Sequence, residues 1–260
     1  MIRALNTAAT GMHAQEENVN TISNNIANVN TVGFKKSRTE FEDLLYETVK
    51  EPGAKSGQDT SYNVGKQMGS GVKVTSNAKE HTQGGMQITN NVYDLMINGE
   101  GFFGVMVDGK TTYTRDGTFN VSPEGVLQTK KGYNIYPGIT VPPNAKSINI
   151  SESGDVDVYL SDKVEPVRAG TIPIFTFINP KGLKDLGGNL SMSTTASGAP
   201  MENIPGKEHA GTIQQGALEV SNVNVMNEMT NLIKAQRAYE MNSKVMGVAD
   251  QMLQIINNIR

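Results

Sequence analysis

Both ends of the chain carry apolar residues at a seven-residue spacing. The C-terminal rows are Val225, Leu232, Tyr239, Met246 and Leu253, then Ala235, Asn242, Ala249 and Ile256 three places on, with Ala238, Val245, Met252 and Ile259 beside them. The N-terminal rows are Leu5, Met12, Val19 and Ile26, each followed three places on by Ala8, Gln15, Ile22 and Val29. Rows of this kind make one apolar stripe along a helix, and a repeat of seven predicts a left-handed supercoil. We therefore expect the two ends to pair as a coiled-coil stem.

The C-terminal stripe is long for a chain of 260 residues. As a helix over residues 225–259 it would span roughly 52 Å, at about 1.5 Å per residue. The N-terminal helix contains several asparagines, whose side chains compete for backbone hydrogen bonds and weaken a helix. They are Asn6, Asn18, Asn20, Asn24, Asn25 and Asn28. We expect both helices to be marginal alone and stable only when neighbours cover them. The simpler alternative is an ordinary two-helix hairpin that closes one domain.

The positions of the prolines divide the chain. All ten lie between Pro52 and Pro205, so both ends are free of the residue that breaks long helices. We expect the first helix to end near Thr31, with Gly33 as its stop. The predicted fold class is α+β, with a helical stem of residues 1–32 and 222–260, an extended connector of 33–80, and an inserted all-β domain of 81–221.

The middle of the chain changes to a period of two, which is typical of strands. The expected strands are residues 95–97, 102–107, 111–114, 118–121, 126–128, 147–150, 156–159, 172–178 and 212–220. The expected turns between them are Asp108-Gly109, Asp116-Gly117, Glu124-Gly125 and Lys131-Gly132. By contrast, residues 52–71 have no apolar period. They are either a flexible linker or a loop that orders only against neighbouring subunits.

Composition excludes several classes of protein. The net charge of −3 gives no general basic field for nucleic acid, and the absence of cysteine removes disulfides and thiolate metal sites. No run approaches the 18 apolar residues that suggest a membrane span. The N-terminus lacks the apolar core of a secretory signal, so a protein that leaves the cytoplasm would do so without a cleaved signal peptide.

Candidate chemistry in the sequence is weak. Residues 99–104 spell G-x-G-x-x-G, but a β-type run follows instead of the helix that a dinucleotide site needs. The three histidines, His13, His81 and His209, lack metal-ligand spacing, and we expect them at the surface. Arg115 beside Asp116 is interpreted as a surface ion pair within a turn. Paired carboxylates for glycoside hydrolysis could come from Asp94, Glu100, Asp108 and Asp116. We expect no enzyme, and no catalytic, cofactor or metal site.

Four segments resemble sequence motifs of a known protein family, and they occur in the same order along the chain. Residues 24–35 (NNIANVNTVGFK) and residues 221–239, which contain SNVNV and LIKAQRAY, are similar to the N- and C-terminal signatures of the bacterial flagellar rod and hook proteins. Residues 98–103 (NGEGFF) and 113–117 (YTRDG) resemble motifs of the β domain in that family. Within the family, the length and residues 46–65 are most similar to the distal rod proteins, with the proximal rod proteins as the nearest alternative.

The resemblance implies a helical assembly of identical subunits that forms a rigid hollow drive shaft, with the terminal helices around an export channel. It implies a stem packed through Leu5, Met12, Val19, Ile22, Ile26, Val225, Leu232, Tyr239, Met246, Leu253 and Ile256. It also implies that residues 46–65 interlock neighbours and stiffen the rod, through Tyr46, Pro52, Gly53, Ser56, Gln58 and Tyr62.

The implied location is the basal body, with the rod crossing the periplasm and the outer rings. The implied partners are further copies of the chain, proximal rod proteins, the hook or hook–filament junction side, the P and L ring proteins, the flagellar type III export apparatus and a rod cap. Nucleic acid and direct membrane insertion are not expected. The other classes considered are a cell-wall hydrolase, for which no convincing carboxylate pair is present, and a coiled-coil adhesin, for which no receptor-facing segment is present.

Overall fold

The computed structural model describes residues 2–51, 64–160, 165–207 and 210–258. The chain forms two compact units. The first comprises Met1–Ile26, Ser37–Ala78 and Asn224–Arg260, and the second comprises Ala27–Lys36 and Lys79–Val223. The chain therefore passes between the units four times.

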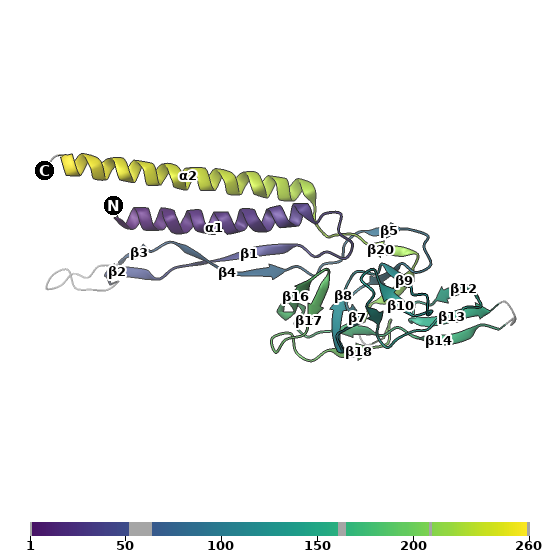
Figure 1. The fold of residues 1–260 in the computed structure, drawn as a ribbon. Coiled ribbons are helices and arrows are strands. Elements are labelled where there is room, and N and C mark those ends of the chain that lie inside the picture. Colours follow the sequence, from purple (N-terminus) through teal and green to yellow (C-terminus); the bar gives the residue numbers. More distant parts are fainter. Residues whose placement is uncertain (1, 52–63, 161–164, 208–209, 259–260) are drawn as a thin grey trace. The chain divides into compact units, whose positions relative to one another are not determined.

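Two helices dominate the first unit. The helices α1 (Ile2–Ala27) and α2 (Val225–Asn258) lie side by side and antiparallel (Figure 1). The side chain of Asn25 donates a hydrogen bond to Glu228 over 3.3 Å. Further along, Gly11 lies so close to Asn242 that a Cβ would come within 2.8 Å of the amide nitrogen. These contacts confirm that the two ends of the chain meet as helices.

The N-terminal helix ends earlier than the sequence analysis predicted. It stops at Ala27, and residues 28–30 form a turn, so the expectation of an end near Thr31 is wrong. The amide of Thr31 instead donates to the carbonyl of Asn28 over 3.1 Å. The asparagines at 28 and 30 explain the early stop, because asparagine favours turns over a helix interior.

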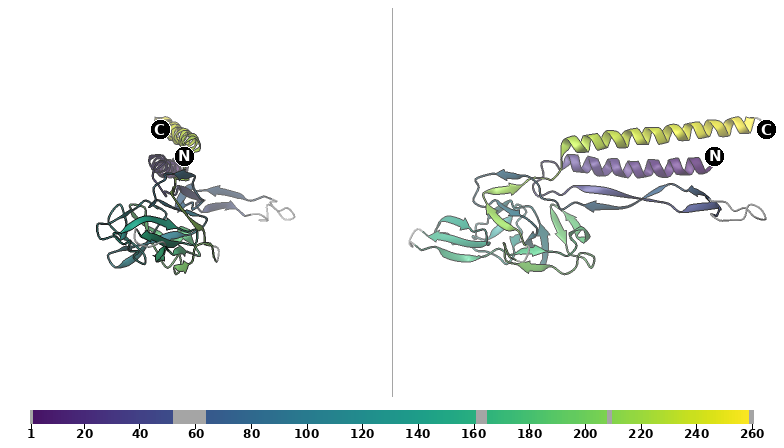
Figure 2. Two further views of the ribbon diagram at one scale, coloured as in Figure 1. Left: turned by 90° about the vertical axis from the view of Figure 1, so that its right-hand side faces the viewer. Right: turned by 180° about the vertical axis from the view of Figure 1, so that it is seen from behind.

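A two-stranded ribbon accompanies α1. It consists of β1 (Ser37–Asp43), β2 (Tyr46–Lys50), β3 (Lys66–Gly69) and β4 (Val72–Lys79), with β1 paired to β4 and β2 to β3. Thr39 donates to the hydroxyl of Thr21 over 3.0 Å, and a side chain at Gly71 would clash with Thr10. In this unit α1 therefore lies between α2 and the ribbon, as both views show (Figures 1 and 2).

The second unit is built of short strands. In chain order they are β5 (Met86–Ile88), β6 (Leu95–Asn98), β7 (Phe102–Val107), β8 (Lys110–Thr114), β9 (Phe119–Val121), β10 (Leu127–Thr129), β11 (Asn134–Ile135), β12 (Ala145–Ile150), β13 (Asp155–Leu160), β14 (Val167–Thr171), β15 (Ile174–Thr176), β16 (Lys184–Gly187), β17 (Leu190–Met192), β18 (Met201–Asn203), β19 (Thr212–Gln215) and β20 (Ala217–Glu219), with a 3₁₀ turn at Pro180–Gly182. The largest sheet runs β16-β17-β8-β7-β11-β10-β9, and β15 joins β7 to β18. Three smaller sheets are β12-β13-β14, β6-β19 and β5-β20. The core between them includes Leu95, Ile97, Phe103, Phe119, Ile135, Ile172, Ile174 and Ile213.

Most of the strands expected from the sequence are present, but the expected strand 212–220 and the expected turn at Gly117 need correction. The run 212–220 is interrupted at Gly216, where φ is +75°, and forms β19 and β20. Asp108 and Gly109, with φ of 49° and 76°, form the predicted tight turn between β7 and β8. Gly117 does not form such a turn. It lies against the backbone carbonyl of Leu95, where any side chain would clash.

Candidate functional site: a buried charged centre and an exposed helix face

A cluster of three charged side chains lies in the interior of the second unit. Lys35, Arg115 and Glu219 are only 4%, 6% and 1% exposed. The ammonium of Lys35 donates to Glu219 Oε1 over 2.6 Å and to the carbonyl of Thr82 over 2.7 Å. The same carboxylate oxygen accepts from the amide of Gly84 over 2.8 Å. Glu219 thus joins segments that are far apart in the sequence.

Arg115 completes this charged centre from the β-rich side. Its guanidinium donates to Glu219 Oε2 over 3.4 Å, to the carbonyl of Ile97 over 3.3 Å and to the carbonyl of Gly99 over 2.6 Å. It also lies 5.5 Å from the ring centroid of Phe102, a distance typical of a cation–π contact. The expectation of a surface ion pair between Arg115 and Asp116 is therefore wrong, because Arg115 is buried and pairs with Glu219.

A glycine allows the first chain segment to approach the charged centre. Gly33 has φ of +68°, and its amide donates to the carbonyl of Glu219 over 2.8 Å. A Cβ at this position would come within 2.7 Å of the backbone of Arg115 and Asp116. Gly33 is therefore a point of close approach between segments, and not the helix stop that the sequence analysis predicted.

Burial governs the protonation of the cluster. It lowers the pKa of Lys35, and the attraction of Glu219 opposes this shift while the positive charge of Arg115 adds to it. Burial likewise lowers the pKa of Arg115, opposed by Glu219 and then by Glu100. A single carboxylate at the centre therefore faces two cations, so its charge is essential to both.

His81 lies beside this cluster and was wrongly expected at the surface. Within the described part of the chain, neither of its buried ring nitrogens has a hydrogen-bond partner. Its ring meets the ring of Phe102 edge to face at 5.6 Å. Burial lowers the pKa of His81 to about 4, and the cations Lys35, Lys79 and Arg115 add to that shift, while Asp185 opposes it. His13 is exposed on α1 near Glu16 and Glu17, and His209 lies outside the described residues.

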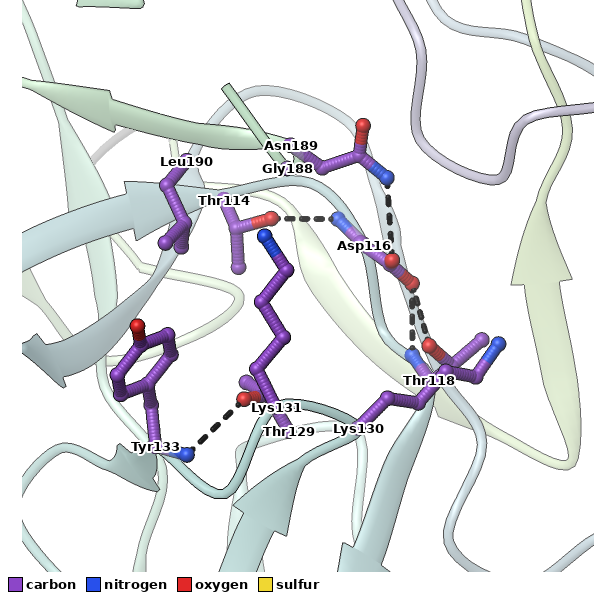
Figure 3. Close-up of a pocket in the computed structure, with 10 residues that line it drawn as sticks. All are labelled: Thr114, Asp116, Thr118, Thr129, Lys130, Lys131, Tyr133, Gly188, Asn189 and Leu190. Atoms are coloured by element: carbon purple, nitrogen blue, oxygen red, sulfur yellow. Dashed lines mark hydrogen bonds between the residues drawn. The ribbon is translucent and has the colours of Figure 1, made fainter. Parts of the chain in front are cut away.

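Asp116, one of the candidate carboxylates, lines a small cavity of about 180 Å³ (Figure 3). Asp116 accepts hydrogen bonds from the backbone and hydroxyl of Thr118 over 3.0 and 2.8 Å, and from Asn189 over 3.2 Å. Asn189 also donates to the carbonyl of Val32 over 3.1 Å. Asp116 therefore holds loops together. Of the other carboxylates, Asp94 is buried and accepts from Asn91, Asp108 lies in a turn, and Glu100 is exposed. Among the described residues, no group of three His, Cys, Asp or Glu side chains could hold a metal ion.

The predicted stem residues of α1 differ in how far they are buried in the first unit. Ile22 is buried, while Leu5, Met12, Val19 and Ile26 are half-buried. The buried positions of this helix also include Ala8, which belongs to the predicted apolar rows, and Ala14 and Asn25, which do not.

On α2 the predicted stem rows, here called the seam, are only partly covered, and a second apolar face is exposed. Ala235 and Ala249 are buried, and Leu232, Met246 and Leu253 are half-buried, but Val225, Tyr239 and Ile256 stay 42%, 44% and 51% exposed. Beside the seam lies a second apolar row at alternating intervals of four and three residues, which we call the outer stripe. Its members are Met241, Val245, Val248, Met252 and Ile255, each between 49% and 61% exposed. The stripe is part of the apolar surface that a single copy leaves uncovered.

The ribbon carries further exposed apolar side chains. Every residue of β2 and β3 is exposed, including the predicted contact residue Tyr46 at 56%. The predicted residues Pro52, Gly53, Ser56, Gln58 and Tyr62 lie outside the described residues. No helix in the described part of the chain is long and apolar enough to cross a membrane.

The sequence matches known proteins along nearly its whole length. Residues 5–35 match the family described as flagella basal body rod protein, residues 96–158 the flagellar hook protein FlgE/F/G D1 domain, and residues 214–259 the flagellar basal body rod FlgEFG protein C-terminal region. The chain is 46% identical to the flagellar basal-body rod protein FlgG of Buchnera aphidicola, over 98% of each chain, and 46% identical to FlgG of Caulobacter vibrioides, over 100% of each. The chain belongs to the flagellar rod and hook protein family.

Membership in the rod and hook family settles the broad class of the protein. It is a structural subunit of the flagellar basal-body rod, in a family that is not enzymatic. Rod-family membership also implies self-assembly and association with other basal-body and hook components. The crystal structure of the Helicobacter pylori hook protein FlgE2 overlaps 71% of this chain and 43% of its own, with 14% identity and a TM-score of 0.26, too low to support a structural argument.

Removing the central carboxylate should destabilise the rod subunit strongly. We expect Glu219→Gln to lower the free energy of unfolding of the second unit by about 3–5 kcal/mol, because two buried cations lose their only charged partner inside the cluster. Urea unfolding followed by circular dichroism measures the change. Glu124→Gln, at an exposed position, is the control and should shift the midpoint little. An unaltered midpoint for Glu219→Gln would contradict the central role of this side chain.

His81 should make the stability of the second unit depend on acidity. Its pKa is depressed in the folded chain, from an ordinary value of 6.5 to about 4, so the folded state favours the neutral ring. The resulting stability is present above about pH 6.5 and is lost as the pH falls toward 4. We expect His81→Phe to remove this component, so that its unfolding midpoint falls less than that of the wild type between pH 7 and 4. The exposed control His13→Gln should follow the wild type, and parallel curves for all three proteins would refute the assignment.

Proposed function

We propose that the chain is a subunit of the distal rod, which assembles with further copies into a rigid hollow shaft that transmits motor torque and surrounds an export channel. The observation that carries this proposal is the outer stripe of α2. A soluble single copy rarely keeps a continuous apolar row exposed over this length. Burying the exposed part of each stripe residue would contribute on the order of 1 kcal/mol.

The width of the apolar surface supports packing against more than one neighbour. A helix that pairs with one partner needs a narrow seam, whereas the outer stripe of α2 adds a second apolar row beside the seam that faces α1. We infer that α1 and α2 pair as a coiled-coil stem, through Leu5, Met12, Val19 and Ile26 on one side and Val225, Leu232, Met246 and Leu253 on the other. Tyr239, Ile256 and the outer stripe then meet neighbouring copies.

The exposed ribbon supports the distal assignment. An isolated two-stranded ribbon is at best marginally stable in water, and β2 and β3 expose every residue. Leu45, just before β2, and Val64, two residues before β3, are also exposed, at 89% and 82%. We infer that residues 46–65 order against neighbouring subunits and stiffen the rod. Relatives named FlgG are similar over nearly the full chain, and they support a distal position in the rod more than a proximal one.

The remaining expectations complete the proposal. The subunit would be exported without a cleaved signal peptide through the type III apparatus, assemble beneath a rod cap, and join the proximal rod to the hook side within the P and L rings. We also propose the domain division into a stem of residues 1–32 and 222–260, a connector of 33–80 and a β domain of 81–221. A cell-wall hydrolase is not favoured by any observation on the described carboxylates.

A charge on the outer stripe should block assembly without unfolding the subunit. We expect Val248→Lys to leave the circular dichroism and monomer stability unchanged and to abolish rod growth, because the ammonium would be buried between copies. Electron microscopy of basal bodies from cells complemented with the variant measures this. Gln251→Lys, at an exposed polar position of the same helix, is the control and should support normal rods. Normal rods with Val248→Lys would exclude the outer stripe as an interface.

Deleting Pro52–Ser61 should change the stiffness of the rod rather than its formation. We expect exported subunits that assemble into curved or flexible rods, because side chains that interlock neighbours are lost. Electron micrographs of isolated basal bodies measure curvature. Replacing the same residues by Gly and Ser preserves length, so that variant separates the effect of side chains from that of spacing. Straight rods of full stiffness in the deletion strain would refute the role of this stretch.

A further inference from the structure

The four passages of the chain between the units fall in short, well-defined places. They lie between Ile26 and Ala27, between Lys36 and Ser37, between Ala78 and Lys79, and between Val223 and Asn224. A force that acts on the helices of a rod subunit can reach its β-rich unit along these covalent passages. How the segments beside them are bonded within each unit therefore decides whether one segment or several carry the force.

In the second unit, one side chain bonds three of the four segments. Asn222 lies one residue before the last passage, and its Oδ1 accepts from the amide of Lys36 over 2.8 Å. Its Nδ2 donates to the carbonyl of Glu80 over 2.8 Å, and to the carbonyl and hydroxyl of Thr82 over 3.2 and 2.9 Å. The backbone amide of Glu80 also donates to the carbonyl of Lys36 over 2.9 Å. Asn222 therefore ties the segments beside the second, third and fourth passages.

In the first unit, another asparagine has the same arrangement. Asn25 is 2% exposed and lies just before the first passage. Its Oδ1 accepts from the amide of Ser37 over 2.9 Å, and its Nδ2 donates to the carbonyl of Ser37 over 2.8 Å. The same Nδ2 donates to Glu228 in the first turn of α2 over 3.3 Å. Asn25 thus ties the end of α1, the start of β1 and the start of α2.

Asparagine suits both places for a definite chemical reason. Its planar amide carries a donor and an acceptor, so it can pair with both the amide and the carbonyl of a backbone residue. Asparagine is otherwise a poor residue for a helix interior, and an unpaired buried amide would be costly. Neither position contributes to the apolar seam. Hydrogen bonds to backbone groups of other segments therefore account for asparagine at both positions.

We propose that Asn25 and Asn222 are positioning residues that brace the chain passages, each inside its own unit, so that torque is shared among several segments. This goes beyond the rod function, because it assigns to two side chains the way in which the subunit carries load. It also gives a physical role to the asparagines of two signature segments, residues 24–35 and 221–225, that the apolar pattern leaves unexplained.

Hydrogen exchange on the full chain tests the bracing directly. Asp keeps the acceptor of Asn and loses the donor, so Asn222→Asp keeps the bond from the Lys36 amide and turns a carboxylate toward the carbonyls of Glu80 and Thr82. We expect amide exchange to rise on the order of tenfold around Glu80 and Thr82, the effect of losing about 1.4 kcal/mol. Strands β7 and β13 should keep their protection. Asn30→Asp is the control, since Asn30 is an exposed asparagine of the other signature segment, residues 24–35. Unchanged exchange, or a uniform rise that includes β7 and β13, would overturn the proposal.

Swimming under load tests the functional consequence. Cells that carry Asn25→Asp or Asn222→Asp should assemble rods, and their speed should fall more steeply than that of wild-type cells as the viscosity of the medium rises. Cells with Asn30→Asp should match the wild type. If the Asn25→Asp subunit does not accumulate in cells, hydrogen exchange and swimming speed are both measured on Asn222→Asp and on the milder variant Asn222→Ser. Wild-type speeds at every viscosity, in cells whose purified variant shows the faster exchange, would refute load sharing.

Discussion

The structure of the second unit depends on one buried carboxylate. Glu219 is held between Lys35 and Arg115, and these three residues come from the start, the middle and the end of the unit. A charge removed from water must be compensated locally, because the protein interior screens it poorly. The segments that carry these residues are therefore held together by the charged centre, next to the apolar core that includes residues of β6, β7 and β19.

The first unit follows a different principle. Except for Ile22, its buried positions among the described residues are small or polar, such as Ala8, Ala235 and Asn25, while large apolar side chains of α2 remain exposed. Small residues let α1 and α2 approach closely, and the large ones stay exposed in a single copy. A unit with a buried charged centre is thus covalently joined to a helical unit whose buried positions are mostly small or polar.

The sequence predicted those parts of the fold that depend on periodicity. The seven-residue rows indicated both helices, and alternation and Asp-Gly or Gly signals indicated the strands around Phe103 and Val158, because such patterns are local. The charged centre could not be predicted in this way. Arg115 beside Asp116 has the local appearance of a surface turn, and only the tertiary fold brings Glu219 to it, from 104 residues away. The available signal was that Lys35, Arg115 and Gly33 all lie in segments that resemble family motifs. The early end of α1 was missed because the heptad row continues to Val29 while asparagine ends the helix.

The place of Glu219 in the chain has a consequence for how the molecule comes into being. A polypeptide emerges from the ribosome with its N-terminus first, so Lys35 and Arg115 are present long before their shared carboxylate. Until residue 219 arrives, closing the interior would leave two cations without a charged partner, and β6 and β5 would lack β19 and β20. Compaction of the second unit is therefore disfavoured until nearly the whole of its sequence has been synthesised.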